Sequence, residues 1–453
     1  MSYRFLHLSD IHFGQEKGGK LVTHDDVRQM LIADAKEVAD VHGAANLILV
    51  AGDITYSGQE SEYRTAAEWL DQLAIASGCR DIDVRVVPGN HDCDLGQVGT
   101  VASLVHKSIR SHHITANDSL AGICAASDDA NPLLPKLKAY RDFAAGYGCD
   151  FATASRPVWT NDLPLSTGRT LRLVGMNSVQ VSDRHDTRGN MILGNAQYTL
   201  PDEPRVIYFT VMHHPLDWFL DKHDAERYLY NRAKILMFGH EHVSDLHVTK
   251  NIQGNEWMAI YSGAATPPET SDIYHHTYNW IEVSVEQVHD DAVLVVRVRP
   301  RVWAPERTRF APDYQRLNGE ESSRFEMTCR PFTPKAAVQL PARMLRQQVS
   351  PSDDSQNDGV VSGGLPTMTT HEIEAAAKLK LLFWRYLTWQ QRLKILVEAD
   401  ALPASASQPL PQTLERQALE NVAKSGKLAD VWDAVMMFVP DEKKQSNPFR
   451  SSR

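Results

Sequence analysis

The chain has 453 residues, of which 42% are hydrophobic and 23% charged, the balance of a soluble globular protein with two or three domains. No stretch approaches the roughly 20 apolar residues needed to cross a bilayer, and polar residues follow the N-terminus too soon for a secretory signal. We therefore expect no membrane association and a cytoplasmic location. The formal charge of −10 excludes a surface that is basic throughout, but it leaves room for a local basic patch.

The cysteines give the same indication of compartment. There are five of them, an odd number, and no two form a Cys-x-x-Cys pair. A disulfide framework or a zinc-thiolate site is therefore not expected. Reduced thiols in a cytoplasmic protein are the simpler prediction.

Short apolar runs alternate with amphipathic stretches in the first 90 residues. The spacing predicts strands over 5–8, 46–51 and 84–87 and helices over 25–42 and 60–76. This alternation is typical of an α/β layered fold. Residues 94–148 are helical in pattern and weakly apolar, as in an insertion beside a site. Further strands are predicted over 170–176, 206–212, 235–238, 258–261, 280–285 and 292–298.

The composition changes near the C-terminus. We divide the chain into a main domain over 1–320, a strap and flexible linker over 321–370, and a small all-α domain over 371–453. In the last domain Thr388 and Gln391 predict a capping box, and Gly426 predicts a helix end. This domain carries a net charge of +2, against −12 for the rest of the chain.

Five short motifs each follow a predicted strand. They are Asp10-Ile11-His12, Gly52-Asp53, Gly89-Asn90-His91-Asp92, His213-His214-Pro215 and Gly239-His240-Glu241-His242. Because ligands bind at the carboxyl ends of strands in open α/β sheets, these loops are expected to converge.

The residue types in these motifs suit a pair of metal ions. Two divalent ions about 3.5–4 Å apart need a bridging ligand and mixed nitrogen and oxygen ligands around each. A carboxylate such as Asp53 can bridge. Imidazole with carboxylate favours Mn, Fe, Zn or Co over Ca, and we favour Mn. A water bridging the ions would lose its proton near neutral pH and act as the nucleophile.

The five motifs, in this order over residues 1–300, resemble the calcineurin-like metallophosphoesterase superfamily. The resemblance implies a two-sheet β-sandwich flanked by helices, with a dinuclear centre at one end. One metal would be held by Asp10, His12, Asp53 and His242, and the other by Asp53, Asn90, His213 and His240. His214 would support a ligand or face the substrate. His91 would steady the phosphate and protonate the leaving oxygen, with Asp92 orienting His91 or holding its loop.

The opening residues together with Gly89–Asp92 and Gly239–His242 resemble the phosphodiesterase and nuclease branches. Family protein phosphatases carry an arginine soon after the asparagine-histidine motif, whereas Cys93-Asp94-Leu95-Gly96 follows here. We therefore predict a phosphodiesterase acting on a nucleotide or nucleic acid. The alternatives are a phosphomonoesterase or protein phosphatase, and a non-catalytic nucleotide-binding or protein-binding protein whose tail mediates assembly.

Two basic segments bear on the substrate. Residues 293–316 carry six arginines with interleaved aromatics, which suits either a nucleic-acid track or a final strand with an arginine face and a packed strap. We favour the strand. Arg184 and Arg188 are candidates to hold a substrate phosphate, and an ordinary exposed loop is the alternative.

The C-terminal segment over 371–453 resembles small death-like adaptor domains appended to bacterial effector enzymes. The resemblance implies docking to a protein partner and a role as a recruited effector, for instance in bacterial defence. The alternative is a helical oligomerisation or lid domain. From the sequence we expect removal of residues 371–453 to leave turnover of small substrates intact.

Overall fold

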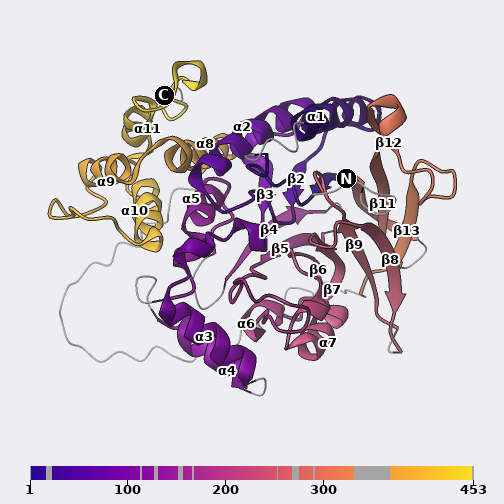
Figure 1. The fold of residues 1–453 in the computed structure, drawn as a ribbon. Coiled ribbons are helices and arrows are strands. Elements are labelled where there is room, and N and C mark those ends of the chain that lie inside the picture. The colour runs from indigo at the N-terminus through magenta and orange to yellow at the C-terminus, as the bar shows by residue number, and fades with distance from the viewer. Residues whose placement is uncertain are drawn as a thin grey trace, which may run out of the picture.

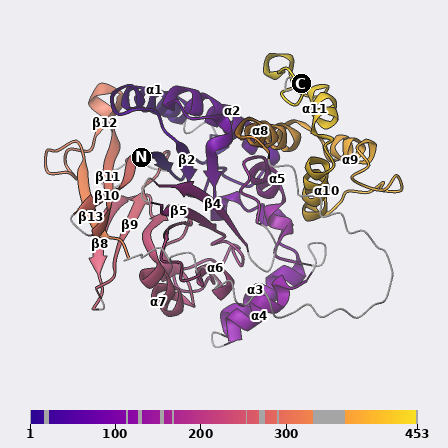
Figure 2. The same ribbon diagram turned by 180° about the vertical axis from the view of Figure 1, so that it is seen from behind.

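The computed structural model describes residues 2–16, 23–112, 115–126, 131–151, 157–165, 168–252, 254–267, 275–288, 291–330 and 368–450. Two mixed β-sheets lie at the centre, with helices above and below them (Figure 1). The opposite view shows the C-terminal helices packed beside α2 and α5 at one side of the molecule (Figure 2). This arrangement confirms the predicted α/β sandwich with a small C-terminal helical region.

The first sheet has the strand order β12-β11-β10-β1-β2-β3, and β13 pairs with β11. Its strands are β1 (Ser2–Leu8), β2 (Leu47–Val50), β3 (Val84–Val86), β10 (Thr277–Val288), β11 (Asp291–Ala304), β12 (Arg309–Pro312) and β13 (Ser323–Thr328). Strands β1, β2 and β3 are parallel, and β10 is antiparallel to β1. All four residues of β2 are buried, as expected of a parallel strand covered on both faces.

The second sheet has the order β4-β5-β6-β7-β9-β8. Its strands are β4 (Val158–Pro164), β5 (Thr170–Met176), β6 (Val206–Val211), β7 (Ala233–Phe238), β8 (Ser244–Lys250) and β9 (Glu256–Ser262). Strands β5, β6, β7 and β9 are parallel, and the two edge strands are antiparallel to their neighbours. Strands β4 and β8 were not predicted from the sequence, because most of their exposed positions carry polar residues that break the apolar pattern.

The main core fills the space between the two sheets. Phe5 of β1 and Phe209 of β6 bring their ring centroids within 6.5 Å of each other across it. The helices of this part are α1 (Thr23–His42), α2 (Glu60–Ser77), α3 (Thr100–Ser111), α4 (Ala116–Cys124), α5 (Lys138–Gly146), α6 (Asn195–Tyr198) and α7 (Lys222–Arg232). Burial of both inner sheet faces provides the main stabilisation of this sandwich.

The insertion with α3, α4 and α5 is anchored to the loop that follows β5. The ammonium group of Lys136, which is buried, donates to the carbonyl oxygens of Gln180 and Ser182 at 2.9 and 2.7 Å. Arg110 of α3 pairs with Asp183 of the same loop at 2.7 Å. The insertion therefore supports the loop that carries the two candidate substrate arginines.

The C-terminal helices are α8 (Thr370–Tyr386), α9 (Trp389–Glu398), α10 (Gln412–Lys424) and α11 (Leu428–Met436), and they enclose a hydrophobic core of their own. The capping box of Thr388 and Gln391 is present, and Gly426 has a φ of 73°. Most of the predicted strap and linker, residues 331–367, lies outside the described residues. The domain boundaries therefore stay predictions.

Candidate metal centre

All five motifs lie at the carboxyl ends of strands, in loops that are tied together by their backbones. The loop after β1 meets the loop after β2, since Asp10 donates its N–H to Gly52 at 3.0 Å and Ile11 donates to Asp53 at 2.9 Å. In the second sheet, Gly239 after β7 donates to the carbonyl oxygen of His213 after β6 at 3.0 Å. The two sheets thus present their loops to one point.

The backbone at this point is strained. Five non-glycine residues here have a positive φ, between 51° and 68°: Asp10, His12, Asp53, His240 and His242. Only three other non-glycine residues of the described chain do so. A positive φ in a side-chain-bearing residue costs on the order of 1–3 kcal/mol and clusters at functional sites. The fold therefore sustains this strain where the candidate ligands converge.

Asp53 lies at the centre of the cluster. Its Oδ2 atom is 3.4 Å from Nε2 of His12 on one side and 3.2 Å from Nε2 of His213 on the other. Its Oδ1 atom accepts the backbone N–H of His91 at 2.8 Å. One carboxylate oxygen therefore faces an imidazole nitrogen from each half of the site, as a bridging ligand requires.

On the first side of Asp53, Asp10, His12 and His242 bring one donor atom each within 4.8 Å of one another. The Nε2 atom of His242 lies 3.1 Å from Oδ1 of Asp10. The Nδ1 atom of His12 lies 3.4 Å from the carbonyl oxygen of Thr266, which leaves its Nε2 atom toward the cluster. A carbonyl partner of this kind fixes the ring of a metal-binding histidine.

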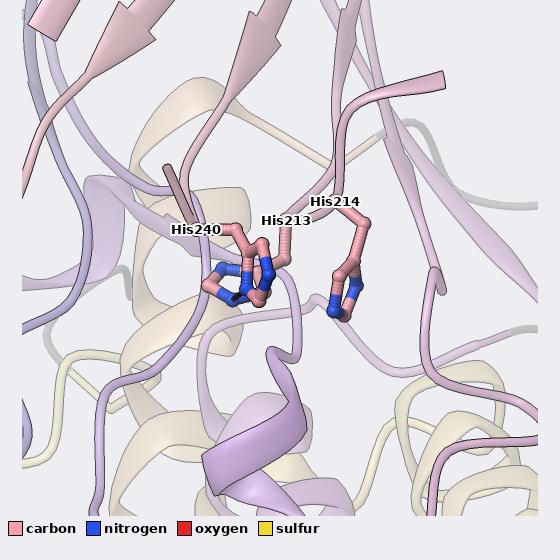
Figure 3. Close-up of side chains that lie close together, drawn as sticks. All are labelled: His213, His214 and His240. Atoms are coloured by element: carbon pink, nitrogen blue, oxygen red, sulfur yellow. Dashed lines mark hydrogen bonds between the residues drawn. The ribbon is translucent and has the colours of Figure 1, made fainter. Parts of the chain in front are cut away.

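On the second side lie three imidazoles from the ends of β6 and β7, those of His213, His214 and His240 (Figure 3). Nε2 of His213 is 3.2 Å from Nδ1 of His240, so both nitrogens face one point. Nδ1 of His213 lies 2.8 Å from the carbonyl oxygen of Ala51. The Oδ1 atom of Asn90, the residue before His91, is buried and has no hydrogen-bond partner among the described residues.

The donor set fits two divalent cations. It contains imidazole nitrogens, two buried carboxylates and an unpartnered amide oxygen, the mixed set preferred by Mn, Fe, Zn and Co. These groups are consistent in chemistry with a dinuclear site for divalent metal ions. The assignment of each residue to one ion stays a prediction.

The buried carboxylates and imidazoles of the cluster shift one another's pKa values. Burial alone would raise the pKa of Asp53, but the neighbouring His213 and His91 hold it well below the usual value, so this carboxylate stays ionised. Burial lowers the pKa of His240 to about 3, with His213 adding to the effect. The pKa of His214 is likewise held well below its usual value by burial and by His240. His213 differs: burial lowers its pKa, but the facing Asp53 carboxylate outweighs burial and raises it to about 9. Because metal ligation requires neutral imidazoles, a bound cation would displace a proton from His213.

His91 is oriented by Tyr56, a residue that the sequence analysis missed. The Nδ1 atom of His91 lies 2.9 Å from the carbonyl oxygen of Tyr56, and the two rings stack with centroids 5.0 Å apart. The ring of His12 is 4.9 Å away. His91 is half-buried, so its ring is held at the rim of the cluster.

Asp92 holds the loops rather than the His91 ring. Its buried carboxylate accepts the N–H groups of Ile54, Thr55 and Gly89 at 3.2, 3.0 and 2.9 Å. It also accepts the hydroxyl of Tyr63 at 2.9 Å. Of the two roles predicted for Asp92, these hydrogen bonds favour the second, because they join the segment after Asp53 to the start of the Gly89–Asp92 turn.

The two candidate substrate arginines differ in their surroundings. The guanidinium of Arg188 lies 5.8 Å from the ring centroid of Trp218, and that ring is 4.3 Å from the ring of His240. Arg188 also pairs with Glu241 at 2.6 Å. Arg184 is exposed on the same loop. The structure therefore connects Arg188 to the rim of the cluster through Trp218.

The arginine-rich segment over 293–316 forms β11, β12 and the turn after them. Arg301 pairs with Asp34 of α1, and Arg299 lies 3.7 Å from Glu282 of β10. The aromatic rings of Trp303 and Phe310 pack against each other. The strand interpretation of this segment is the one that the structure supports.

Comparison with known proteins identifies the two parts of the chain. A family model described as calcineurin-like phosphoesterase matches residues 3–244, more than half of the chain. A second model, the GTPase-associated adaptor domain, matches residues 375–437 and confirms the predicted adaptor-like C-terminus. Among the described residues, no helix has the length and apolar character needed to span a membrane.

A curated relative is the uncharacterized metallophosphoesterase-like protein YydB of Bacillus subtilis. It is 23% identical over 298 residues, which cover 59% of this chain and 55% of the relative. The chain thus spans about half the length of that protein.

Solved structures with similar folds include a putative 5'-nucleotidase from Staphylococcus aureus, with 11% identity, coverage of 92% of this chain and 82% of that one, and a TM-score of 0.38. Another is the purple acid phosphatase PPD1 of yellow lupin, Lupinus luteus, with 11% identity, coverage of 74% and 57%, and a TM-score of 0.35. A 5'-nucleotidase precursor from Thermus thermophilus has 11% identity, coverage of 72% and 55%, and a TM-score of 0.32. These scores are too low to support an inference about substrate.

Gly52 provides a test of the geometry of the centre. Its φ is +93°, and a Cβ atom there would lie 2.5 Å from Nδ1 of His213. We expect Gly52→Ala to displace His213 and so to weaken Mn²⁺ binding at least tenfold. The positive φ adds a separate cost to the free energy of folding, on the order of 1–3 kcal/mol. Calorimetric titration measures the Mn²⁺ affinity.

The matched control is Gly99→Ala. Gly99 has an ordinary negative φ, and no atom lies within 4 Å of an added Cβ. This variant should bind Mn²⁺ like the wild type. Equal Mn²⁺ affinity in both variants would show that His213 takes no part in holding the ion.

Proposed function

Because the chain belongs to the calcineurin-like phosphoesterase family, we propose that it is a metal-dependent phosphodiesterase acting on a nucleotide or nucleic-acid substrate. The observation that carries the proposal is the position of the Asp53 carboxylate between His12 and His213. Two bound divalent ions, which we propose to be Mn²⁺, would neutralise charge on the phosphoryl oxygens and activate a water for in-line attack.

The protein's own residues would orient the substrate and handle the proton. Asp53 fixes the His91 backbone through the N–H group, and Tyr56 fixes the His91 ring. His91 would therefore donate a proton to the departing oxygen from a set position. Asp92 keeps the two loops that carry Asp53 and His91 at a fixed separation.

The diester preference rests on the sequence after His91 and on the rim of the site. No arginine follows the Gly89–Asp92 turn, in contrast with family protein phosphatases. Trp218 lies against His240 at the rim, with Arg188 over its ring. An aromatic surface next to a cation suits a base or sugar attached to the phosphate.

The adaptor match supports a protein partner for the C-terminal helices. We propose that residues 371–453 recruit the enzyme to such a partner, and that it acts as an effector in bacterial defence. The five cysteines are buried and unpaired, which fits the proposed cytoplasmic location.

Hydrolysis of bis-p-nitrophenyl phosphate with and without Mn²⁺ tests the proposed activity. We expect turnover that requires Mn²⁺, a loss of at least 100-fold in Asp53→Asn because both ions would share that carboxylate, and a loss of about 10²–10⁴-fold in His91→Ala from the absent proton donor. Parallel incubation with cyclic nucleotides, DNA, RNA and phosphopeptides identifies the substrate class.

His112→Ala is the matched control, because His112 is an exposed histidine of the insertion. It should retain full turnover. A wild type without Mn²⁺-dependent turnover on any of these substrates would favour the alternative of a binding protein. Cleavage of phosphopeptides alone would contradict the diesterase proposal.

Arg188 tests the rim of the site. Replacing it with alanine removes a cation from the Trp218 ring, so we expect KM for a nucleotide substrate to rise about fivefold to tenfold with little change in kcat, as when binding equal in ground and transition states is lost. Arg184→Ala on the same loop should raise KM less. A larger effect at Arg184, measured under the same conditions, would place the phosphate contact there instead.

A further inference from the structure

The adaptor helices dock on the phosphoesterase through charged contacts around an apolar centre. Helix α8 lies beside α5 and near the end of α2 in both ribbon views (Figures 1 and 2). Leu381 of α8, 1% exposed, belongs to the main core, and Ala145 of α5 belongs to the adaptor core. The two hydrophobic cores therefore interlock at this junction.

The charges at the junction are complementary. Arg385 of α8 donates to both carboxylate oxygens of Asp71 on α2 at 2.8 and 2.9 Å. Lys380 and Arg416 each lie 3.1 Å from Asp150 of the main domain. Basic side chains of the adaptor thus face acidic side chains of the phosphoesterase, which fixes the register of docking.

A continuous row of contacts runs from Arg385 to Asp92 at the metal centre. The hydrogen bonds by which the Asp92 carboxylate joins the Asp53 and His91 loops are called the Asp92 clamp here. Arg385 donates to the hydroxyl oxygen of Tyr147 at 2.6 Å. The ring of Tyr147 packs against Phe143 at 5.1 Å, and Phe143 packs against Tyr63 at 4.9 Å. Tyr63 donates its hydroxyl to Asp92 at 2.9 Å.

Helix α2 contributes two residues to these contacts, one that contacts Arg385 and one that contacts Asp92. Asp71 and Tyr63 both belong to this helix, eight positions apart, and both are buried. Arg385 therefore holds α2 directly through Asp71 and holds α5 through Tyr147. A shift of α8 would move the two helices between which the rings of Tyr63 and Phe143 are packed.

We propose that docking of α8 positions the Asp92 clamp, so that the adaptor controls the metal centre from a distance. Arg385 and Tyr63 are then positioning residues: Tyr63 acts through Asp92, which sets the spacing of the Asp53 and His91 loops. A partner that moves α8 would change metal binding and turnover without reaching the site. The proposal rests on the proposed function for its catalytic readout and departs from the expectation that the adaptor is dispensable for turnover.

The experiment uses full-length variants at the junction. Arg385→Ala removes the contacts to Asp71 and Tyr147. Gly146→Leu is a second way to displace α8, because a Cβ at Gly146 would lie 3.3 Å from Cδ1 of Leu381 and 3.6 Å from its carbonyl oxygen. Lys394→Ala is the matched control, since Lys394 is an exposed cation of α9 that pairs with Glu398 of the same helix.

Two quantities are measured for each variant: Mn²⁺ affinity by calorimetric titration, and kcat and KM on bis-p-nitrophenyl phosphate. We expect Arg385→Ala and Gly146→Leu to weaken Mn²⁺ binding and to lower kcat, each about tenfold, with KM nearly unchanged, because a small displacement of positioned groups is costly. Lys394→Ala should match the wild type.

A double-mutant cycle tests the row itself. In a Tyr63→Phe background, which keeps the ring but removes the hydroxyl donated to Asp92, adding Arg385→Ala should have little further effect on either quantity. Full additivity of the two changes would overturn the proposed row of contacts.

Different results would contradict the coupling through α8 and the phosphodiesterase activity. Wild-type turnover together with unchanged Mn²⁺ affinity and kcat in Arg385→Ala and Gly146→Leu would overturn the coupling and leave the phosphodiesterase proposal standing. A wild type that binds Mn²⁺ but hydrolyses nothing would overturn the enzymatic proposal, and the Mn²⁺ affinities of the same variants would still decide the coupling.

Discussion

The site depends on a single buried carboxylate placed between two sets of imidazoles. Oδ2 of Asp53 is close to His12 of the first sheet and to His213 of the second. A carboxylate buried to this extent is costly unless positive charge faces it. The buried Asp53 carboxylate needs positive charge beside it, and this need also makes it a strong ligand for cations. The two sheets therefore surround a group that requires a metal ion or a proton next to it.

The fold meets this requirement by bringing loops of both sheets to one end. Residues far apart in sequence become neighbours because the parallel strands β1, β2 and β3 end at the same edge of their sheet, and β6 and β7 do so in theirs. Positive φ values at Asp10, His12 and Asp53 turn the side chains back toward the centre. The remaining strand pairs and helices supply the packing that offsets this strain.

Much of this could be predicted from the sequence. Continuous apolar runs indicated the buried strands, and the polar motifs after them indicated the residues that cluster at one end of the sheets, since both signals are local. The edge strands β4 and β8 lacked such a signal because their exposed positions carry polar residues. The supporting residues Tyr56, Tyr63 and Thr266 were missed, because their roles arise only from contacts made across the fold.

The docking of the adaptor likewise lay beyond the sequence. A net charge of +2 in the last 83 residues, beside a charge of −12 elsewhere, suggests attraction but not a register. The structure shows which basic side chains meet which acidic ones, and that Arg385 also reaches an aromatic row leading toward Asp92. The two parts of the chain are therefore in direct contact through these side chains.

Anomalous diffraction from crystals of the full chain grown with Mn²⁺ tests the central claim most directly. The account predicts two peaks about 3.5–4 Å apart, one on each side of Asp53, with Oδ2 in contact with both. A single peak, or two peaks of which only one touches Asp53, would contradict it.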